Sequence, residues 1–235
     1  MDPDAKLHET AGLIADRNRA QLLLVLLSGT PQSGSALAEA AGISRSLASA
    51  HLTKLVAGGL VQAEPSGRQR LYTIASPQVA DAIEGLIHIA PPSEVRSLRE
   101  ATRSRSLRWA RMCYDHLAGV VGVTVTDALL DRDLIREQDG AFTLAPGGTA
   151  GFCEFGVDMA GLEARRRPLL RPCLDWSERR HHLAGSLGAA IAAELIRRRW
   201  VRRQTASRIV SVTPAGEDGL HDWLGIDLTE LRAAA

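Results

Sequence analysis

The hydrophobic pattern of residues 33–59 is typical of two helices separated by a tight turn. A helix rich in small residues is predicted over residues 35–41, and Gly42 follows it with a tolerance of positive φ that suits a sharp turn. Ser44 stands where an N-cap belongs, because its hydroxyl can accept a hydrogen bond from an unpaired amide of the next helix. The apolar side chains of residues 44–57 recur at helical spacing, and they are Leu47, Ala48, Leu52, Leu55 and Val56.

After this helix-turn-helix, the pattern changes to two short β-prone runs, which predicts a hairpin. The runs are residues 60–63 and 70–74, and they flank the turn-forming segment at residues 65–68, Pro-Ser-Gly-Arg. A helix fits the major groove of DNA, while an adjacent loop that carries arginine can reach the phosphates. Hydroxyls and cations suit base edges and phosphates. We therefore expect the DNA contacts to come from Ser44, Arg45, Ser46, Ser49, His51, Thr53, Lys54, Arg68 and Arg70.

Roughly the first 90 residues resemble the winged-helix repressors of the ArsR type. A helix over residues 16–27, which begins Asp-Arg-Asn-Arg, is similar to the helix that opens this domain. The other resembling marks are Ser49-x-His51-Leu52-x-x-Leu55, Gly59-Leu60-Val61, and Gly67-Arg68 through Tyr72. The resemblance implies a homodimer that binds an imperfect palindrome in double-stranded DNA and represses transcription until an effector releases it.

Two questions about this region stay open in the sequence. The imidazole of His51 can touch DNA, or it can pack under the helix. The winged helix can also contact protein instead of DNA, because one fold hosts unrelated functions, so a scaffold or partner-binding protein is the alternative. An enzyme is not expected, since the sequence contains no P-loop, GxSxG, HExxH or dinucleotide-binding fingerprint.

Two further helices are predicted between the winged helix and the C-terminal half. Residues 77–89 place four apolar side chains on one helical face, and the corresponding helix of ArsR-type repressors joins the first helix in the dimer interface. These side chains are Val79, Ile83, Leu86 and Ile87. Ser93 is then the expected cap of an arginine-rich connecting helix within residues 92–112, which either is a solvated connector or contacts phosphate.

The C-terminal half contains an internal duplication. His-Leu-Ala-Gly-x-x-Gly occurs at residues 116–122 and again at 182–188, and Cys-x-Asp occurs at 113–115 and 173–175. A repeat of this period predicts two packed copies of one helix–hairpin–helix unit, at about residues 113–165 and 173–235. The expected fold is therefore mainly α with small β-hairpin wings. It divides into a winged helix (residues 1–91), a connecting helix (92–112) and a duplicated effector or assembly domain (113–235).

The two copies differ in charge although the net charge of the chain is only +1. Residues 113–160 contain eight acidic residues and two arginines, whereas residues 160–210 contain four acidic residues and twelve arginines, including the run Arg197-Arg198-Arg199. Opposite charges either hold the copies together, or the second copy supplies an accessory phosphate contact.

The effector is expected to act on the C-terminal half, where four candidate ligands occur at matching places in the repeat. Many ArsR-type repressors sense metals through thiolates on the helix before the recognition helix, but residues 35–41 contain no Cys, His or Asp. If the copies face each other, Cys113, His116, Cys173 and His182 could converge on one soft metal ion such as zinc.

Three alternatives to a metal stay open. The two thiols could form a reversible disulfide, or an organic ligand could lie between the copies near Trp109, Trp176 and Trp200. The cysteines could instead be small buried hydrophobes, with no cofactor at all.

Cysteine content and hydropathy point to a cytoplasmic protein without a membrane partner. Three cysteines are too few and too scattered for a disulfide framework. The N-terminus lacks a signal peptide pattern, and no apolar run approaches the length of a membrane span.

Overall fold

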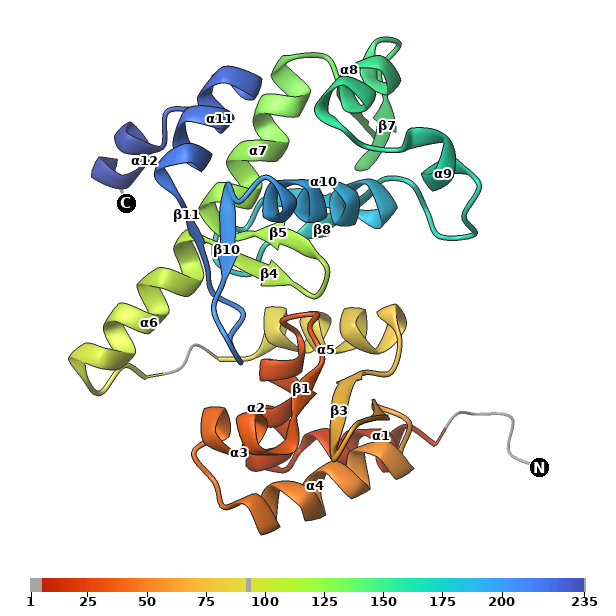
Figure 1. Cartoon of the computed structure of the whole chain (residues 1–235), viewed down its shortest axis with the longest axis vertical. Helices are drawn as coiled ribbons and strands as arrows, with labels where there is room; N and C mark the ends of the chain where they lie inside the picture. The colour runs from red at the N-terminus through yellow and green to blue at the C-terminus, as the bar shows by residue number, and fades with distance from the viewer. Residues whose placement is uncertain (1–5, 92–93, 235) are drawn as a thin grey trace. The chain divides into compact units, whose positions relative to one another are not determined.

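The computed structural model describes residues 6–91 and 94–234, and these form two compact units (Figure 1). One unit contains the N-terminal residues up to Ala90 together with the short segment Thr205–Arg208. The other contains the remaining C-terminal residues. Each unit has its own arrangement of helices and small antiparallel sheets.

The N-terminal unit is a winged helix-turn-helix. Its three-stranded antiparallel sheet has the order β1-β3-β2, and Val61 pairs with Ile74 where the wing joins the body of the domain. The elements in chain order are α1 (Leu7–Ile14), α2 (Arg17–Leu26), β1 (Gln32–Ser33), α3 (Gly34–Ala41), α4 (Arg45–Ala57), β2 (Val61–Ser66), β3 (Gln69–Ile74) and α5 (Pro77–Ile89).

Short polar side chains cap helices α2 to α5 of this unit. The Ser44 hydroxyl accepts a hydrogen bond from the amide of Leu47 at 3.2 Å, as the sequence predicts for an N-cap, and Gly42 adopts a φ of +67° in the turn. Leu52 and Leu55 are fully buried beneath α4. Two residues of the apolar pattern are not part of this core, because Leu47 is 41% exposed and Val56 is 37% exposed.

Helix α5 has the predicted bounds but not the predicted apolar face. Ile83 is only 5% exposed and belongs to the core of the N-terminal unit. Leu86 and Ile89, by contrast, are 43% and 80% exposed. The surface of α5 that is free for a partner is therefore centred on Leu86 and Ile89, because Ile83 is used to fold the monomer.

The C-terminal unit begins with a helix that is shorter than predicted. Helix α6 starts at Leu98, where the Ser97 hydroxyl accepts a hydrogen bond from the amide of Glu100, while Ser93 lies outside the described residues. The elements are α6 (Leu98–Trp109), β4 (Arg111–Cys113), β5 (His116–Ala118), α7 (Gly119–Asp131), β6 (Ile135–Gln138), β7 (Ala141–Leu144), α8 (Gly148–Phe155), α9 (Met159–Glu163), β8 (Arg171–Leu174), β9 (His181–Ala184), α10 (Gly185–Arg197), β10 (Val201–Arg203), β11 (Val210–Val212), α11 (Pro214–Leu224) and α12 (Leu228–Ala234).

After α6, the same order of elements occurs twice. Each half has a hairpin, a 13-residue helix, a second hairpin and two helices, with α7 and α10 as the two long helices. The predicted helix–hairpin–helix unit omitted the hairpin before each long helix, because strands of three or four residues carry too little alternation to be recognised. Within the described residues, none of the helices is long and apolar enough to cross a membrane.

The repeated glycines have a steric reason. Gly119 and Gly185 begin α7 and α10 with φ values of +81° and +86°, in the left-handed region that favours glycine. One turn later, a Cβ on Gly122 would lie 2.6 Å from the carbonyl oxygen of Leu117, and a Cβ on Gly188 would meet the carbonyl of Leu183. The repeated motif thus lets each helix lie directly against the strand that precedes it.

The two halves exchange contacts. Helix α7 packs against β9 and helix α10 packs against β5, so each long helix covers the hairpin of the other half. The amide of Leu183 donates a hydrogen bond to Thr126 Oγ1 at 2.8 Å, and Arg180 forms an ion pair with Asp127. This ion pair joins a carboxylate of the first half to an arginine of the second, which supports the packing interpretation of the charge pattern.

A buried carboxylate, that of Glu194, lies in the last turn of α10. Glu194 is 7% exposed and accepts hydrogen bonds from Arg197 and Arg198, and Arg198 also donates to the carbonyl of Phe155 at 2.6 Å. The hydrogen bond from Arg197, acting against burial and aided by Arg198, lowers the pKa of Glu194 from 4.5 to about 2.

We expect Gly122→Ala to destabilise the protein by about 1–3 kcal/mol, because an added methyl in a closely packed place forces backbone shifts. Chemical denaturation measures this. Gly147→Ala is the matched control, since a Cβ there meets no atom within 4 Å. Equal stability of the two variants would contradict the steric reason for the motif.

We expect Glu194→Gln to lower the melting temperature at pH 7. The folded pKa of about 2 lies below the unfolded value of 4.5, so the carboxylate stabilises the fold fully above pH 4.5 and loses this effect as the pH falls towards 2. The difference between variant and wild type should therefore shrink over that range in thermal melts. Glu163→Gln, at an exposed position, is the control. A difference that does not depend on pH would contradict the ionic role.

Candidate functional site

The recognition helix presents the predicted DNA-contacting side chains to solvent, with one exception. The exposed residues are Ser44, Arg45, Ser46, Ser49, Thr53 and Lys54 on or just before α4, and Arg68 and Arg70 on the wing. Arg45 is the first residue of α4, where a cation beside free helix amides is suited to a phosphate or a base edge. The candidate DNA-contacting side chains are therefore exposed on α4, while Leu52 and Leu55 of the same helix are buried.

His51 is the exception. Its ring is on the inner side of α4, only 9% exposed, with Nε2 at 3.4 Å from the Asn18 amide nitrogen and Nδ1 at 3.7 Å from Asp16. The structure thus corrects its inclusion among the DNA contacts and favours the packing alternative. His51 connects α4 to α2 through polar contacts that helical periodicity does not reveal.

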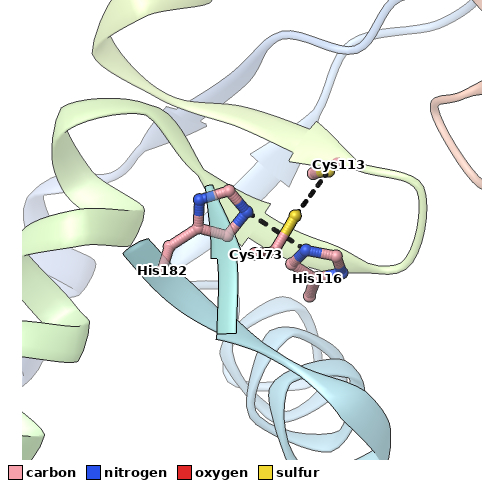
Figure 2. Close-up of side chains that lie close together, drawn as sticks. All are labelled: Cys113, His116, Cys173 and His182. Atoms are coloured by element: carbon pink, nitrogen blue, oxygen red, sulfur yellow. Dashed lines mark hydrogen bonds between the residues drawn. The ribbon is translucent and has the colours of Figure 1, made fainter. Parts of the chain in front are cut away.

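A second candidate site lies within the C-terminal unit, where two hairpins each supply one cysteine and one histidine (Figure 2). In the first hairpin, Cys113 on β4 is the register partner of His116 on β5. In the second, Cys173 on β8 is the register partner of His182 on β9. The repeat therefore produces the same cysteine–histidine pair twice.

These four side chains, which we call the Cys2His2 cluster, converge closely. The sulfur atoms of Cys113 and Cys173 are 3.9 Å apart, and the Nε2 atoms of His116 and His182 are 3.1 Å apart. All four possible ligand atoms lie within 4.8 Å of one another. Cys113, His116 and His182 are buried, and Cys173 is half-buried. Such a group can hold a metal ion or undergo thiol oxidation.

Each histidine of the cluster has a carboxylate behind it. Nδ1 of His116 is 3.1 Å from Asp115, and Nδ1 of His182 is 3.3 Å from Asp175. Both Nε2 atoms therefore point towards the centre of the cluster. The repeated Cys-x-Asp pattern was the signal for these carboxylates. Sequence reasoning did not assign them a role, because the pattern does not show that each aspartate lies beside the Nδ1 atom of a histidine.

The electrostatics of the first hairpin follow from burial and these neighbours. Burial raises the pKa of Asp115, but hydrogen bonds from His116 and Arg167 outweigh it and hold this pKa at about 2. Burial likewise lowers the pKa of His116, while the Cys113 thiolate and Asp115 raise it to about 9. The cluster therefore concentrates negative charge around the imidazole and favours a bound cation, whether a proton or a metal ion.

Asp175 anchors the second hairpin. Its side chain is fully buried and accepts hydrogen bonds from Arg111 at 2.8 Å, from the amide of Gly119 at 2.7 Å and from Ser177. Burial opposes ionisation, but His182 and Arg111 together lower the pKa of Asp175 well below its usual range. One carboxylate thus holds a cluster histidine, an arginine of β4 and the start of α7.

The three tryptophans considered for an organic-ligand site are engaged separately. Trp109, Trp176 and Trp200 each lie beside a different arginine, at 5.2, 4.4 and 5.3 Å respectively: Arg232, Arg111 and Arg198. Each ring has its own cationic neighbour within the C-terminal unit, which gives these tryptophans a role in packing.

The fold and the exposed face of α4 define a class of protein, the winged helix-turn-helix DNA-binding regulators. Residues 16–70 match the profile of the MarR family. The chain is 35% identical over 228 residues to the uncharacterized HTH-type transcriptional regulator YdfF of Bacillus subtilis (strain 168). The alignment covers 97% of this chain and 100% of YdfF. The chain therefore belongs to the family of HTH-type transcriptional regulators.

Two further similarities concern the N-terminal part. A probable mercury resistance operon repressor of Streptomyces lividans is 39% identical over 70 residues, 30% of this chain and 55% of the repressor. HlyU from Vibrio cholerae N16961 is similar at 31% identity over 37% of this chain and 94% of HlyU, with a TM-score of 0.34. The predicted ArsR resemblance holds at the level of winged helix-turn-helix regulators, while the matching profile is that of the MarR family.

Proposed function

We propose that this protein is a cytoplasmic homodimeric repressor that binds an imperfect DNA palindrome and is released by an effector bound in its C-terminal half. The observation that carries the DNA-binding role is the capped helix α4, which exposes hydroxyls and cations and buries Leu52 and Leu55. Similarity to YdfF over 97% of this chain supports a regulator that includes the C-terminal unit.

The contacts to DNA divide by position. Arg45, Ser46 and Ser49 on the first turns of α4 contact base edges in the major groove, while Lys54 lies nearer the end of the helix. Arg68 and Arg70 on the wing hold the phosphate backbone. The net charge of the chain is only +1, so affinity depends on these local cations rather than on a long-range field.

The dimer buries apolar side chains that the monomer exposes. Leu7 on α1 is 75% exposed, and Leu86 and Ile89 on α5 are 43% and 80% exposed. Exposed apolar side chains on two terminal helices favour association, because covering them removes apolar surface from water. A two-fold dimer can then place two recognition helices about 34–36 Å apart, the spacing of successive major grooves.

Release from DNA requires that the effector distinguish two states. An effector changes DNA affinity only if it binds the DNA-competent and incompetent forms with different free energy. The buried Cys2His2 cluster is the strongest candidate for such a site, because its four side chains come from two hairpins that an effector bound there would join.

We expect Arg45→Ala to relax sequence preference at a cost of about 1–3 kcal/mol, as for loss of a bidentate base contact. Arg68→Ala should weaken all DNA similarly and reduce the salt slope by about one unit. Gel shifts with the DNA upstream of its own gene, at several salt concentrations, measure both effects. Arg136→Ala, on exposed β6, is the charge-matched control. Unchanged DNA affinity in both Arg45→Ala and Arg68→Ala would favour the alternative of a scaffold protein.

We expect Leu86→Asp combined with Ile89→Asp to give monomers that no longer bind the operator, because a charge in an apolar interface is left without water. Light scattering measures the mass. Val56→Asp, at an exposed apolar position of α4, should stay dimeric. Ile83→Asp is unsuitable as a test, since that side chain belongs to the monomer core. A double variant that remains dimeric would show that the interface lies elsewhere.

A further inference from the structure

We infer that Cys113, His116, Cys173 and His182 bind one divalent cation in tetrahedral geometry, with Zn²⁺ as the best match. Two thiolates and two imidazoles are a donor set that Zn²⁺ takes in closed four-ligand sites. Carboxylate oxygens, which harder ions prefer, are not among the four converging atoms.

The sulfur–sulfur and nitrogen–nitrogen distances of the cluster fit this ion. A tetrahedral zinc ion with bonds of about 2.3 Å to sulfur and about 2.0 Å to nitrogen holds its two sulfurs about 3.8 Å apart and its two nitrogens about 3.3 Å apart. The corresponding distances are 3.9 Å between the sulfurs and 3.1 Å between the nitrogens. An ion can therefore enter with shifts of only a few tenths of an ångström in these two pairs.

The orientation of the imidazoles gives an independent argument. Because Asp115 and Asp175 lie 3.1 and 3.3 Å from the Nδ1 atoms, each ring directs its Nδ1–H at a carboxylate and its Nε2 into the cluster. The two Nε2 atoms face each other at 3.1 Å, a separation at which they share a cation, either one proton or a metal ion. Carboxylates behind ligating histidines are the usual second layer of a zinc site.

A disulfide between Cys113 and Cys173 is the main rival. It would require the sulfurs to move from 3.9 Å to a bond length of about 2.05 Å. A disulfide would also not explain why the two histidines face each other with a carboxylate beside each Nδ1 atom. The metal accounts for all six side chains, so we favour it.

The position of the site defines what the ion does. Two ligands come from the first hairpin and two from the second, so the ion joins the two halves of the C-terminal unit. Four protein ligands leave no open coordination position, which is typical of structural and sensing sites and not of catalytic ones. That this ion is also the effector rests on the proposed function.

The first test is a titration of the full-length reduced protein with Co²⁺ and then Zn²⁺. We expect one Co²⁺ per chain, with the intense visible bands of tetrahedral coordination and a thiolate-to-metal charge-transfer band, both lost when Zn²⁺ displaces Co²⁺. Cys113→Ser/Cys173→Ser should lose the charge-transfer band, while Cys153→Ser, at the exposed third cysteine, should keep it. A wild type that binds no more tightly than the double variant would overturn the site.

Neighbouring histidines provide a second matched pair. His182→Ala should weaken Co²⁺ binding at least 10-fold, whereas His181→Ala, at the half-exposed neighbour on the same strand, should not. Asp115→Asn should weaken binding about 10- to 100-fold without changing the number of coordinating sulfurs, as expected for a positioning carboxylate. Equal loss in His181→Ala and His182→Ala would contradict the assignment of ligands.

Thiol counting separates the metal from the rival. We expect metal-free protein kept in air to form no disulfide and therefore to show three reactive thiols after unfolding. A count of one, with Cys153 as the remaining thiol, together with no metal uptake by reduced protein, would replace the metal by a disulfide.

The effector role is tested separately on DNA. Gel shifts of wild type with and without stoichiometric Zn²⁺ should differ in operator affinity, and Cys113→Ser/Cys173→Ser should not respond. Metal uptake without any effect on DNA affinity would overturn the effector role and leave a structural ion. Metal uptake by a wild type that binds no DNA would instead overturn the proposed function, since the titration does not depend on DNA.

Discussion

The close approach of backbone to backbone in the C-terminal unit is the constraint on which the rest of that unit depends. Helices α7 and α10 lie against the strands before them at Gly122 and Gly188, where a Cβ would meet a carbonyl group. Since no side chain separates helix from strand, each hairpin is held firmly and its cysteine and histidine are presented at a defined place. The close contact of the four side chains follows from packing two such hairpins face to face.

Electrostatics strengthen this arrangement where it would otherwise be costly. Asp175 is a fully buried carboxylate, and a buried charge is tolerated only when it is paired and hydrogen-bonded. Its partners Arg111 and Gly119 belong to the first half of the unit, while Asp175 belongs to the second. The same residue that orients His182 therefore also ties the halves together, so the geometry of the cluster and the packing of the unit are linked.

The N-terminal unit solves a different problem, because its surface must bind and its core must hold a helix in place. Helix α4 uses Leu52 and Leu55 for the core and leaves Arg45 and Ser49 exposed. His51 shows that some polar residues of this helix lie on its inner side, since its ring contacts Asn18 of α2 and Asp16, the N-cap of α2. The helix is thus rigidly seated from one side and free on the other, as a DNA-reading element must be.

The sequence alone determined the local structure, because caps, glycines and periodicity act within a few residues. Ser44, Gly42 and the bounds of α5 were predictable, and the repeat identified the four residues of the Cys2His2 cluster. Only the tertiary structure decided which side of a helix is used: it buried Ile83 and His51 and exposed Leu47, since burial depends on neighbours distant in sequence. It also decided the roles of Asp115 and Asp175, because a carboxylate orients an imidazole only once folding has brought the two within hydrogen-bond distance.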